Sequence, residues 1–210
     1  LNTVNAACPG EATGGFISST GTDNGCRPFR AAYPLHASYS GTQLAFATAY
    51  LAAHPRTRLV TVSLGANDLF LLETACAGNP TCIAAGLPAA LGTIAANMNF
   101  ILHALRSEFH GVLIVVNYYS LDYTDASGTG ITKLLNQSET ASAHANGAVV
   151  ANVFRAFQSA AAAAGGKTCN AGLLNASPAN QFVCDVHPSQ SGQDRIANTV
   201  EEVYEAARAA

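Results

Sequence analysis

The feature that most constrains the fold is a run of five apolar residues, Val112–Val116, with the sequence VLIVV. Gly111 ends the helical pattern that precedes the run. The run is therefore short and bounded, which indicates a strand. Because no residue in the run is polar, we expect both faces of this strand to be buried. Strands of this kind are typical of parallel sheets that carry helices on both faces.

The rest of the chain alternates between strand and helix patterns, which predicts an α/β fold. Further strands are predicted at Leu1–Ala6, Arg58–Leu64 and Ala148–Val150, and loops at Ser19–Gly41 and Gly165–Asp185. Helices are predicted near Glu11–Ser18, at Thr42–Ala53, along the apolar positions from Leu91 to Leu105, and at Ile131–Asn146, Val153–Ala164 and Ser189–Ala209. The length of 210 residues fits a single domain spanning residues 1–210.

Composition excludes several classes of protein. Hydrophobic residues make up 49% of the chain and charged residues 11%, with a formal net charge of −3. Such a chain is not disordered, because disorder requires low hydrophobicity and high net charge. It has no basic stripe for a nucleic acid partner. No unbroken apolar run approaches the ~20 residues of a transmembrane segment.

Cysteine usage indicates the compartment. The six cysteines are Cys8, Cys26, Cys76, Cys82, Cys169 and Cys184. Sequential pairing (8–26, 76–82 and 169–184) is the simplest connectivity, because each pair brackets a loop-like stretch rich in Gly, Asn, Thr or Pro. Free core thiols are the alternative. Metal binding is disfavoured, since no C-x-x-C and no cysteine pair with a histidine at zinc spacing occurs. Three disulfides predict a secreted protein.

Three polar positions lie where a parallel sheet places its functional groups, at the carboxyl ends of strands. Asn67 follows the strand Arg58–Leu64, and its amide suits the stabilisation of an oxyanion; an Asx turn capping a helix is the alternative. Gly10 follows the first strand and is expected to open a helix with an unpaired N–H; an ordinary strand-to-helix turn is the alternative. His187 precedes the last helix, with Asp185 two residues before it. The other histidines are interpreted as surface or packing residues.

In order and spacing these segments resemble the SGNH hydrolases, also called GDSL esterases and lipases, in their secreted bacterial branch. Asn5–Thr13 (NAACPGEAT) is similar to the second conserved block of that family, Gly65–Asp68 (GAND) to the third, and Asp185–Pro188 (DVHP) to the fifth. The resemblance covers nearly the whole chain. It implies a three-layer, flavodoxin-like α/β/α fold.

The resemblance also implies hydrolysis of a small-molecule or lipid carboxylic ester by a serine-type acyl-enzyme mechanism. Gly10 and Asn67 would be oxyanion donors, His187 the general base and Asp185 its orienting acid. No cofactor and no metal are implied. The apolar run Leu69–Leu72 would line an acyl site or pack into the core.

The chain departs from the family pattern in two places. No G-D-S occurs, so the nucleophile is not identified and the first strand of the family fold is expected to be missing from the chain. A separate N-terminal segment, a partner chain in a swapped dimer or a rearranged sheet would then complete the sheet. The family acid normally precedes the histidine by three residues, where this chain has Cys184; a backbone carbonyl is the alternative partner for His187. The other candidate nucleophiles are Ser18, Ser19, Ser63, Ser189 and Ser191.

Two other functions fit the same sequence features. A truncated, catalytically inactive binding module of the same fold would explain the absent nucleophile. Polysaccharide deacetylation or acyl transfer would use the same residues as ester hydrolysis, so the sequence does not separate these activities.

Overall fold

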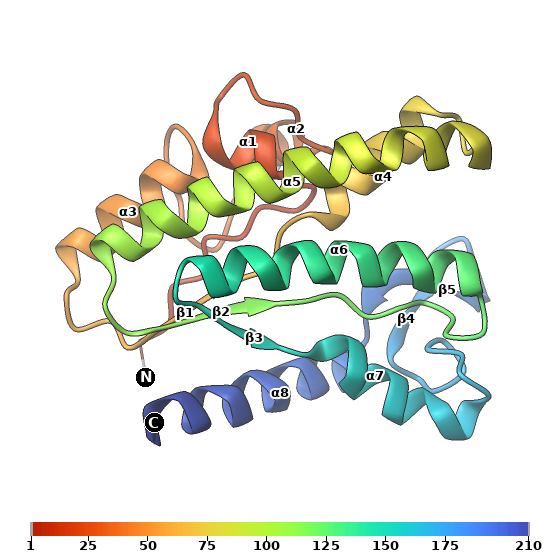
Figure 1. Ribbon diagram of the computed structural model, residues 1–210. Coiled ribbons are helices and arrows are strands. Elements are labelled where there is room, and N and C mark those ends of the chain that lie inside the picture. Colours follow the sequence, from red (N-terminus) through yellow and green to blue (C-terminus); the bar gives the residue numbers. More distant parts are fainter. Residues whose placement is uncertain (1, 210) are drawn as a thin grey trace. The chain divides into compact units, whose positions relative to one another are not determined.

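The computed structural model describes residues 2–209, except for the side chains of Gln181 and Phe182 (Figure 1). Two compact units are described. Unit 1 comprises residues 2–60, Leu64–Gly111 and Ser142–Gly147, and unit 2 comprises Thr61–Ser63, Val112–Ala141 and residues 148–209. The expectation of a single domain over residues 1–210 stays a prediction.

Unit 1 is built on one long helix. Its helices are α1 (Thr13–Ile17), α2 (Cys26–Ala32), α3 (Gln43–Ala53), α4 (Ala66–Ala75) and α5 (Pro80–Glu108). The Asn79 side chain caps α5 by accepting a hydrogen bond from the Cys82 N–H. α5 packs against α1, α3 and α4. It buries a stripe at helical spacing, and this stripe is the core of unit 1: Ile94, Met98, Ile101, Leu102 and Leu105.

Unit 2 contains the sheet, apart from Leu59 and Val60 of β1. The strands β1 (Leu59–Val62), β2 (Val112–Val116) and β3 (Val149–Ala151) lie in the order β1-β2-β3. β2 and β3 are parallel, with Ile114 opposite Val149. The remaining elements are α6 (Ala126–Ala145), α7 (Val153–Ala161), a 3-10 turn (Ala162–Ala164), the antiparallel hairpin β4 (Leu174–Ser177) and β5 (Asn180–Pro188), and α8 (Gln190–Ala209).

Helices flank this sheet. α8 packs on β2 and β3 and also contacts α7, and Figure 1 shows α6 on the other side of the strands. Leu113, Ile114 and Val115 are at most 1% exposed, which confirms that β2 is buried on both faces. The predicted α/β class with a parallel sheet flanked by helices is therefore confirmed.

Several predicted boundaries are wrong. Asn2–Ala6 form no strand, because no strand of the described residues pairs with them; Leu1 lies outside the description. The segment predicted as a loop at Ser19–Gly41 contains α2, and the segment at Gly165–Asp185 contains β4 and the first part of β5. Neither Gly10 nor an Asx turn opens a helix: α1 begins at Thr13, and the residue that caps α4 is Gly65.

The sequential disulfide pairing is confirmed. Cys8–Cys26, Cys76–Cys82 and Cys169–Cys184 are bonded, with Cα–Cα distances of 5.5, 5.6 and 5.7 Å. Cys8–Cys26 fastens the segment before α1 to the start of α2, and Cys169–Cys184 fastens β5. Both of these disulfides lie next to residues that the sequence analysis marks as functional.

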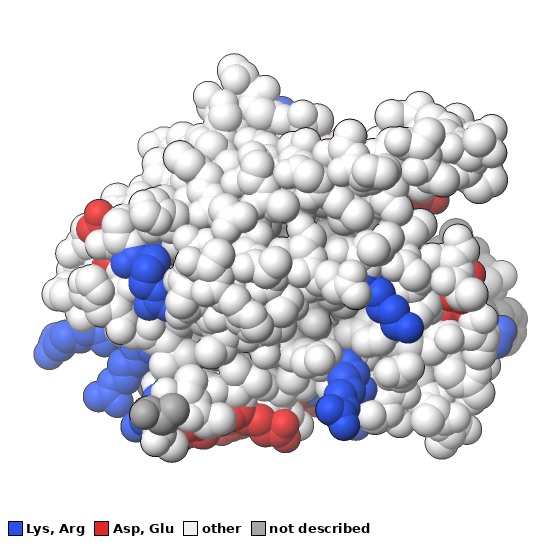
Figure 2. Space-filling view, viewed as in Figure 1, with Lys and Arg blue, Asp and Glu red and all other residues white. Residues whose placement is uncertain are grey.

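By length and composition, α5 is the one described helix that could cross a membrane, with an 18-residue window of mean hydropathy 1.4. The core helix of a soluble protein passes the same test. On the face shown in Figure 2, Lys and Arg side chains are scattered over a mostly uncharged surface.

Candidate active site

The turn at Gly10 requires glycine. Its φ is +79°, in the left-handed region. A Cβ at this position would lie 2.5 Å from the Asn24 carbonyl oxygen, well inside contact distance. The Asn24 N–H donates to the Gly10 carbonyl at 2.8 Å. Among the described residues, the Gly10 N–H has no hydrogen-bond acceptor, as an oxyanion donor requires.

Asn67 reaches back to the same turn. It is the second residue of α4, and its side chain does not cap that helix. Its Nδ2 donates to the Glu11 carbonyl at 2.9 Å, and its Oδ1 accepts from Asn24 Nδ2 at 3.0 Å. The structure thus brings together the two predicted oxyanion residues, Gly10 and Asn67, through the residue that follows Gly10.

Asp68 fixes this arrangement from the next position of α4. Its carboxylate accepts from the Thr13 N–H at 3.0 Å and from the Thr13 hydroxyl at 2.6 Å. Asn97 of α5 donates to the same hydroxyl at 2.9 Å. Burial raises the pKa of Asp68, and the hydrogen bonds from Thr13 oppose that rise. Three elements, α1, α4 and α5, are therefore locked around the turn.

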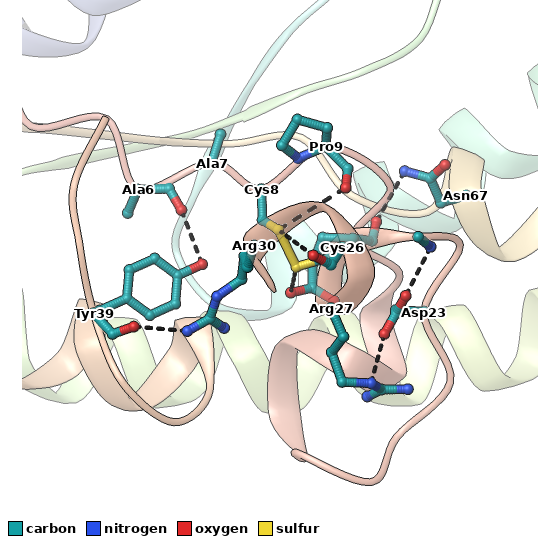
Figure 3. The surroundings of a disulfide bond; sticks show 12 residues. Ala6, Ala7, Cys8, Pro9, Asp23, Cys26, Arg27, Arg30, Tyr39 and Asn67 are labelled. Carbon is teal, nitrogen blue, oxygen red and sulfur yellow. Dashed lines mark hydrogen bonds and ion pairs between the residues drawn. A yellow bond between two sulfur atoms is a disulfide. The ribbon is translucent and has the colours of Figure 1, made fainter. Parts of the chain in front are cut away.

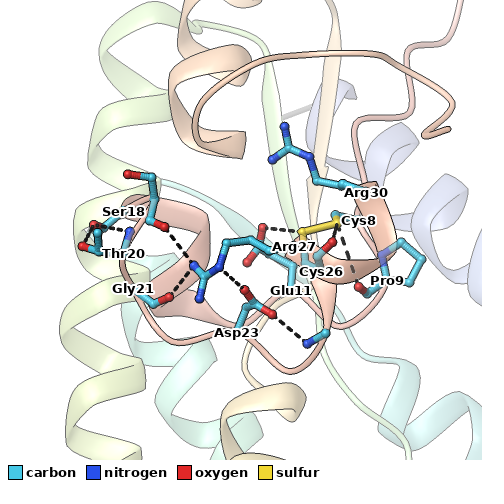
Figure 4. Close-up of polar contacts among 12 residues, drawn as sticks. Cys8, Pro9, Glu11, Ser18, Thr20, Gly21, Asp23, Cys26, Arg27 and Arg30 are labelled. Atoms are coloured by element: carbon cyan, nitrogen blue, oxygen red, sulfur yellow. Dashed lines mark hydrogen bonds and ion pairs between the residues drawn. A yellow bond between two sulfur atoms is a disulfide. The ribbon is translucent and has the colours of Figure 1, made fainter. Parts of the chain in front are cut away.

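Glu11 places a buried carboxyl group in the turn itself. Burial, followed by the nearby Asp23 charge, raises the pKa of Glu11 from 4.5 to about 7. Cys26 is bonded to Cys8 (Figure 3), and the Glu11 Oε2 lies 3.2 Å from the Cys26 Sγ (Figure 4). Its Oε1 has no hydrogen-bond partner among the described residues. Asp23 is in turn paired with Arg27 at 2.8 Å (Figure 4).

One cluster of metal-ligating residue types occurs among the described residues, formed by Cys8, Glu11 and Cys26. Both sulfurs are joined in the disulfide. They offer no thiolate, which is the form in which cysteine binds metals. The cluster is therefore a disulfide in contact with the buried Glu11 carboxyl group, and it lacks the thiolate ligands of a metal site.

The predicted base and acid lie in unit 2, at the end of β5. His187 Nδ1 is 3.4 Å from Asp185 Oδ1, and the His187 side chain is 74% exposed. The backbone N–H of His187 donates to the same Asp185 oxygen at 2.7 Å. The stronger contact of this carboxylate is with the backbone, since 3.4 Å is long for a hydrogen bond to a ring nitrogen.

Tyr119 anchors the backbone between these two residues. Its hydroxyl donates to the Val186 carbonyl at 2.7 Å, and its ring stacks on Phe157 with centroids 4.3 Å apart. Burial, followed by the Asp185 charge, raises the pKa of Tyr119. No local sequence pattern points to Tyr119, because its contact with β5 joins residues 67 positions apart.

None of the candidate serines is paired with a base. Among the described residues, no serine hydroxyl forms a hydrogen bond with a histidine ring. The Ser189 hydroxyl donates to the Gly172 carbonyl at 2.7 Å, so its proton does not face a base. The nucleophile is therefore not identified by geometry.

No protein-family model and no curated protein matches the sequence. Among solved structures, the chain is similar to the phospholipase A1 from Streptomyces albidoflavus NA297, at 20% identity over 70% of this chain and 69% of that chain, with a TM-score of 0.53. It is also similar to the extracellular lipase from Streptomyces rimosus, at 19% identity over 70% of this chain and 69% of that chain, with a TM-score of 0.52. These likenesses agree with the fold that the resemblance implied, and the chain shares the α/β fold of these two proteins.

Proposed function

We propose that the protein is a secreted carboxylic ester hydrolase that acts on lipid esters through an acyl-enzyme formed on a serine. The observation that carries the proposal is the Gly10–Asn67 arrangement. The Gly10 turn offers a backbone N–H without an acceptor among the described residues, and the Asn67 amide of α4 is bonded to the next residue of that turn, in a fold shared with a lipase and a phospholipase.

The chemistry follows from what each group supplies. Attack of a serine oxygen on the ester carbonyl places negative charge on the carbonyl oxygen. The Gly10 N–H and one N–H of the Asn67 amide donate to that oxygen, the kind of stabilisation worth about 2.7–4 kcal/mol per donor. His187 takes the serine proton and returns it to the departing alcohol, and Asp185 orients the ring. Water then releases the acid by the same steps.

The helix that follows Asn67 supports an apolar acyl group in the substrate. None of the α4 residues is buried, and the run Leu69–Leu72 is half-buried. Asp68 and Glu73 are the only charged residues of this helix. We propose that this partly exposed run contacts the acyl chain. Secretion rests on the three disulfides and on the extracellular origin of the S. rimosus lipase.

The strand order makes β1 an edge of the described sheet. Edge strands present unpaired backbone groups. We propose that a further strand pairs with β1, donated by a second copy of the chain or by a separate segment. Light scattering tests the first source: a dimer mass supports exchange between copies, and a monomer mass opposes it.

The deciding experiment combines turnover with active-site labelling. The purified protein is assayed with a p-nitrophenyl ester and with a phospholipid, then treated with a fluorophosphonate, weighed intact and mapped. Turnover together with one adduct on a single serine supports the proposal and names the nucleophile. Absence of both turnover and adduct contradicts it and favours an inactive binding module. Transfer to alcohol acceptors, or release of acetate from acetylated sugar, would identify the other activities.

A further inference from the structure

Asn24 contacts both proposed oxyanion donors. Its backbone N–H donates to the Gly10 carbonyl at 2.8 Å. Its side-chain Nδ2 donates to Asn67 Oδ1 at 3.0 Å. One residue from the segment before α2 therefore joins the turn after Cys8 to the start of α4.

The hydrogen bonds of Asn67 fix the orientation of its amide. The Glu11 carbonyl only accepts hydrogen bonds, so the Asn67 atom that faces it must be Nδ2. Oδ1 then faces Asn24, whose own amide must present Nδ2. A rotation of the Asn67 amide by half a turn would set oxygen against the Glu11 carbonyl and NH₂ against NH₂. The Glu11 carbonyl and the Asn24 amide hold the two ends of the Asn67 amide, so the second N–H of Asn67 has one direction.

Asn24 is itself held in place. The adjacent Asp23 accepts a hydrogen bond from the Gly25 N–H at 2.7 Å and pairs with Arg27 at 2.8 Å. Gly25 has a φ of +115°. Cys26 is bonded to Cys8, two residues before Gly10. The absence of a Cβ at Gly10 lets the Asn24 carbonyl lie directly against the turn.

From this geometry we propose that Asn24 is a positioning residue, which holds the Asn67 amide so that its free N–H points at the developing oxyanion. The inference rests on the proposed function, because it assigns Asn67 as a donor. Asn24 itself does not touch the substrate. Its effect should appear in the transition state, where preorganised donors act.

The expected effect is intermediate. Removing an oxyanion donor lowers kcat by about 10²–10³-fold. Removing a residue that only orients the donor is expected to lower kcat by roughly 10-fold, with KM almost unchanged. Asn24→Ala and Asn24→Asp both keep the backbone N–H that bonds Gly10. Asn24→Asp also keeps the shape of the side chain but cannot donate when ionised, so it tests the hydrogen bond if Asn24→Ala folds poorly.

A double-mutant cycle separates positioning from a general structural role. If Asn24 acts through Asn67, adding Asn24→Ala to Asn67→Ala lowers kcat/KM no further than Asn67→Ala alone. Multiplication of the two single losses in the double variant overturns the inference. The matched control is Asn99→Ala, whose side chain bonds Ala95, Ser142 and Asn146 in the same unit. It should leave kcat unchanged.

A measurement without substrate distinguishes this inference from the proposed function. The side-chain amide of Asn67 is identified in a ¹⁵N NMR spectrum as the pair of peaks missing from Asn67→Ala. In Asn24→Ala this pair should shift and exchange faster with solvent, and in Asn99→Ala it should not. An inactive parent protein with these shifts refutes the function and keeps the Asn24–Asn67 coupling; unchanged peaks in Asn24→Ala refute the coupling.

Discussion

The two halves of the proposed catalytic machinery are built in opposite ways. The surroundings of Gly10 and Asn67 are held by hydrogen bonds from four segments and by a disulfide, and a buried carboxyl group lies against them. At the end of β5, His187 is 74% exposed and its ring meets Asp185 at 3.4 Å. Electrostatic donors gain their effect from preorganisation, whereas catalytic hydrogen bonds of a base often tighten only when substrate binds. The contrast predicts that mutations at the end of β5 lower activity alone, whereas mutations around Gly10 and Asn67 lower both activity and stability.

The largest effect is expected from His187→Ala. Loss of the general base should lower ester turnover by roughly 10³-fold or more. The midpoint of urea unfolding should stay the same, because an exposed ring contributes little packing. His110→Ala, at another exposed histidine, is the control. Activity within a few-fold of the parent would remove His187 from the mechanism.

Asn67→Ala should lower both activity and stability. We expect kcat to fall by about 10²–10³-fold, since an oxyanion donor is lost. The free energy of unfolding should fall by about 1–3 kcal/mol, because the Glu11 carbonyl and Asn24 amide lose their partner. Kinetics and urea denaturation on one preparation measure both quantities. A loss of stability without a loss of kcat would make Asn67 a structural residue only.

Gly10→Ala tests how tightly the turn is packed, and Gly78→Ala is its matched control. Gly78 has a similar φ of +72°, but a Cβ there would meet open space. The left-handed backbone alone should cost each variant about 1–2 kcal/mol. Gly10→Ala should lose at least about 1 kcal/mol more, because its Cβ would displace the Asn24 carbonyl. Equal losses of stability in the two variants would show that the Asn24 carbonyl moves aside at little cost.

The effect expected from Glu11→Gln is on stability alone and depends on pH. The pKa of Glu11 is raised from 4.5 to about 7 in the folded protein. The folded state therefore keeps a proton that the unfolded state releases, so stability declines as pH rises through this window. Glu11→Gln cannot titrate, and the parent should lose stability relative to it between about pH 4.5 and 7. Thermal unfolding over this range measures the difference; parallel curves for the two proteins would contradict the assignment.

The sequence predicted elements well where hydrophobic period or spacing carries the information. The run Val112–Val116 became the buried central strand, and the loop-like stretches between cysteines gave the right disulfides. The spacing of NAACPGEAT and GAND led to Gly10 and Asn67, which the structure joins through Glu11 and Asn24. Their roles in catalysis stay predictions.

The failures have local physical causes. The N-cap residues of α2 and α4 are Gly25 and Gly65, neither of which offers a side-chain cap, so the usual signal of a helix start is missing. α5 continues through Pro88, where sequence rules place a break. β4 and β5 pair with register shifts, which hide the alternation expected of strands. Asn24 and Asp68 act through contacts between residues 43 and 55 positions apart, which no local pattern reports.

The Cys8–Cys26 disulfide has a consequence for how the protein matures. Gly10, Glu11 and Asn24 all lie inside the 18-residue loop that it closes. Until the two thiols are oxidised, ordering that loop costs the full conformational entropy of an open chain. In a reducing compartment, a newly made chain would thus lack the disulfide that holds the turn at Gly10. With the secretion proposed above, oxidation on export would be the step that orders the turn carrying the proposed oxyanion donors.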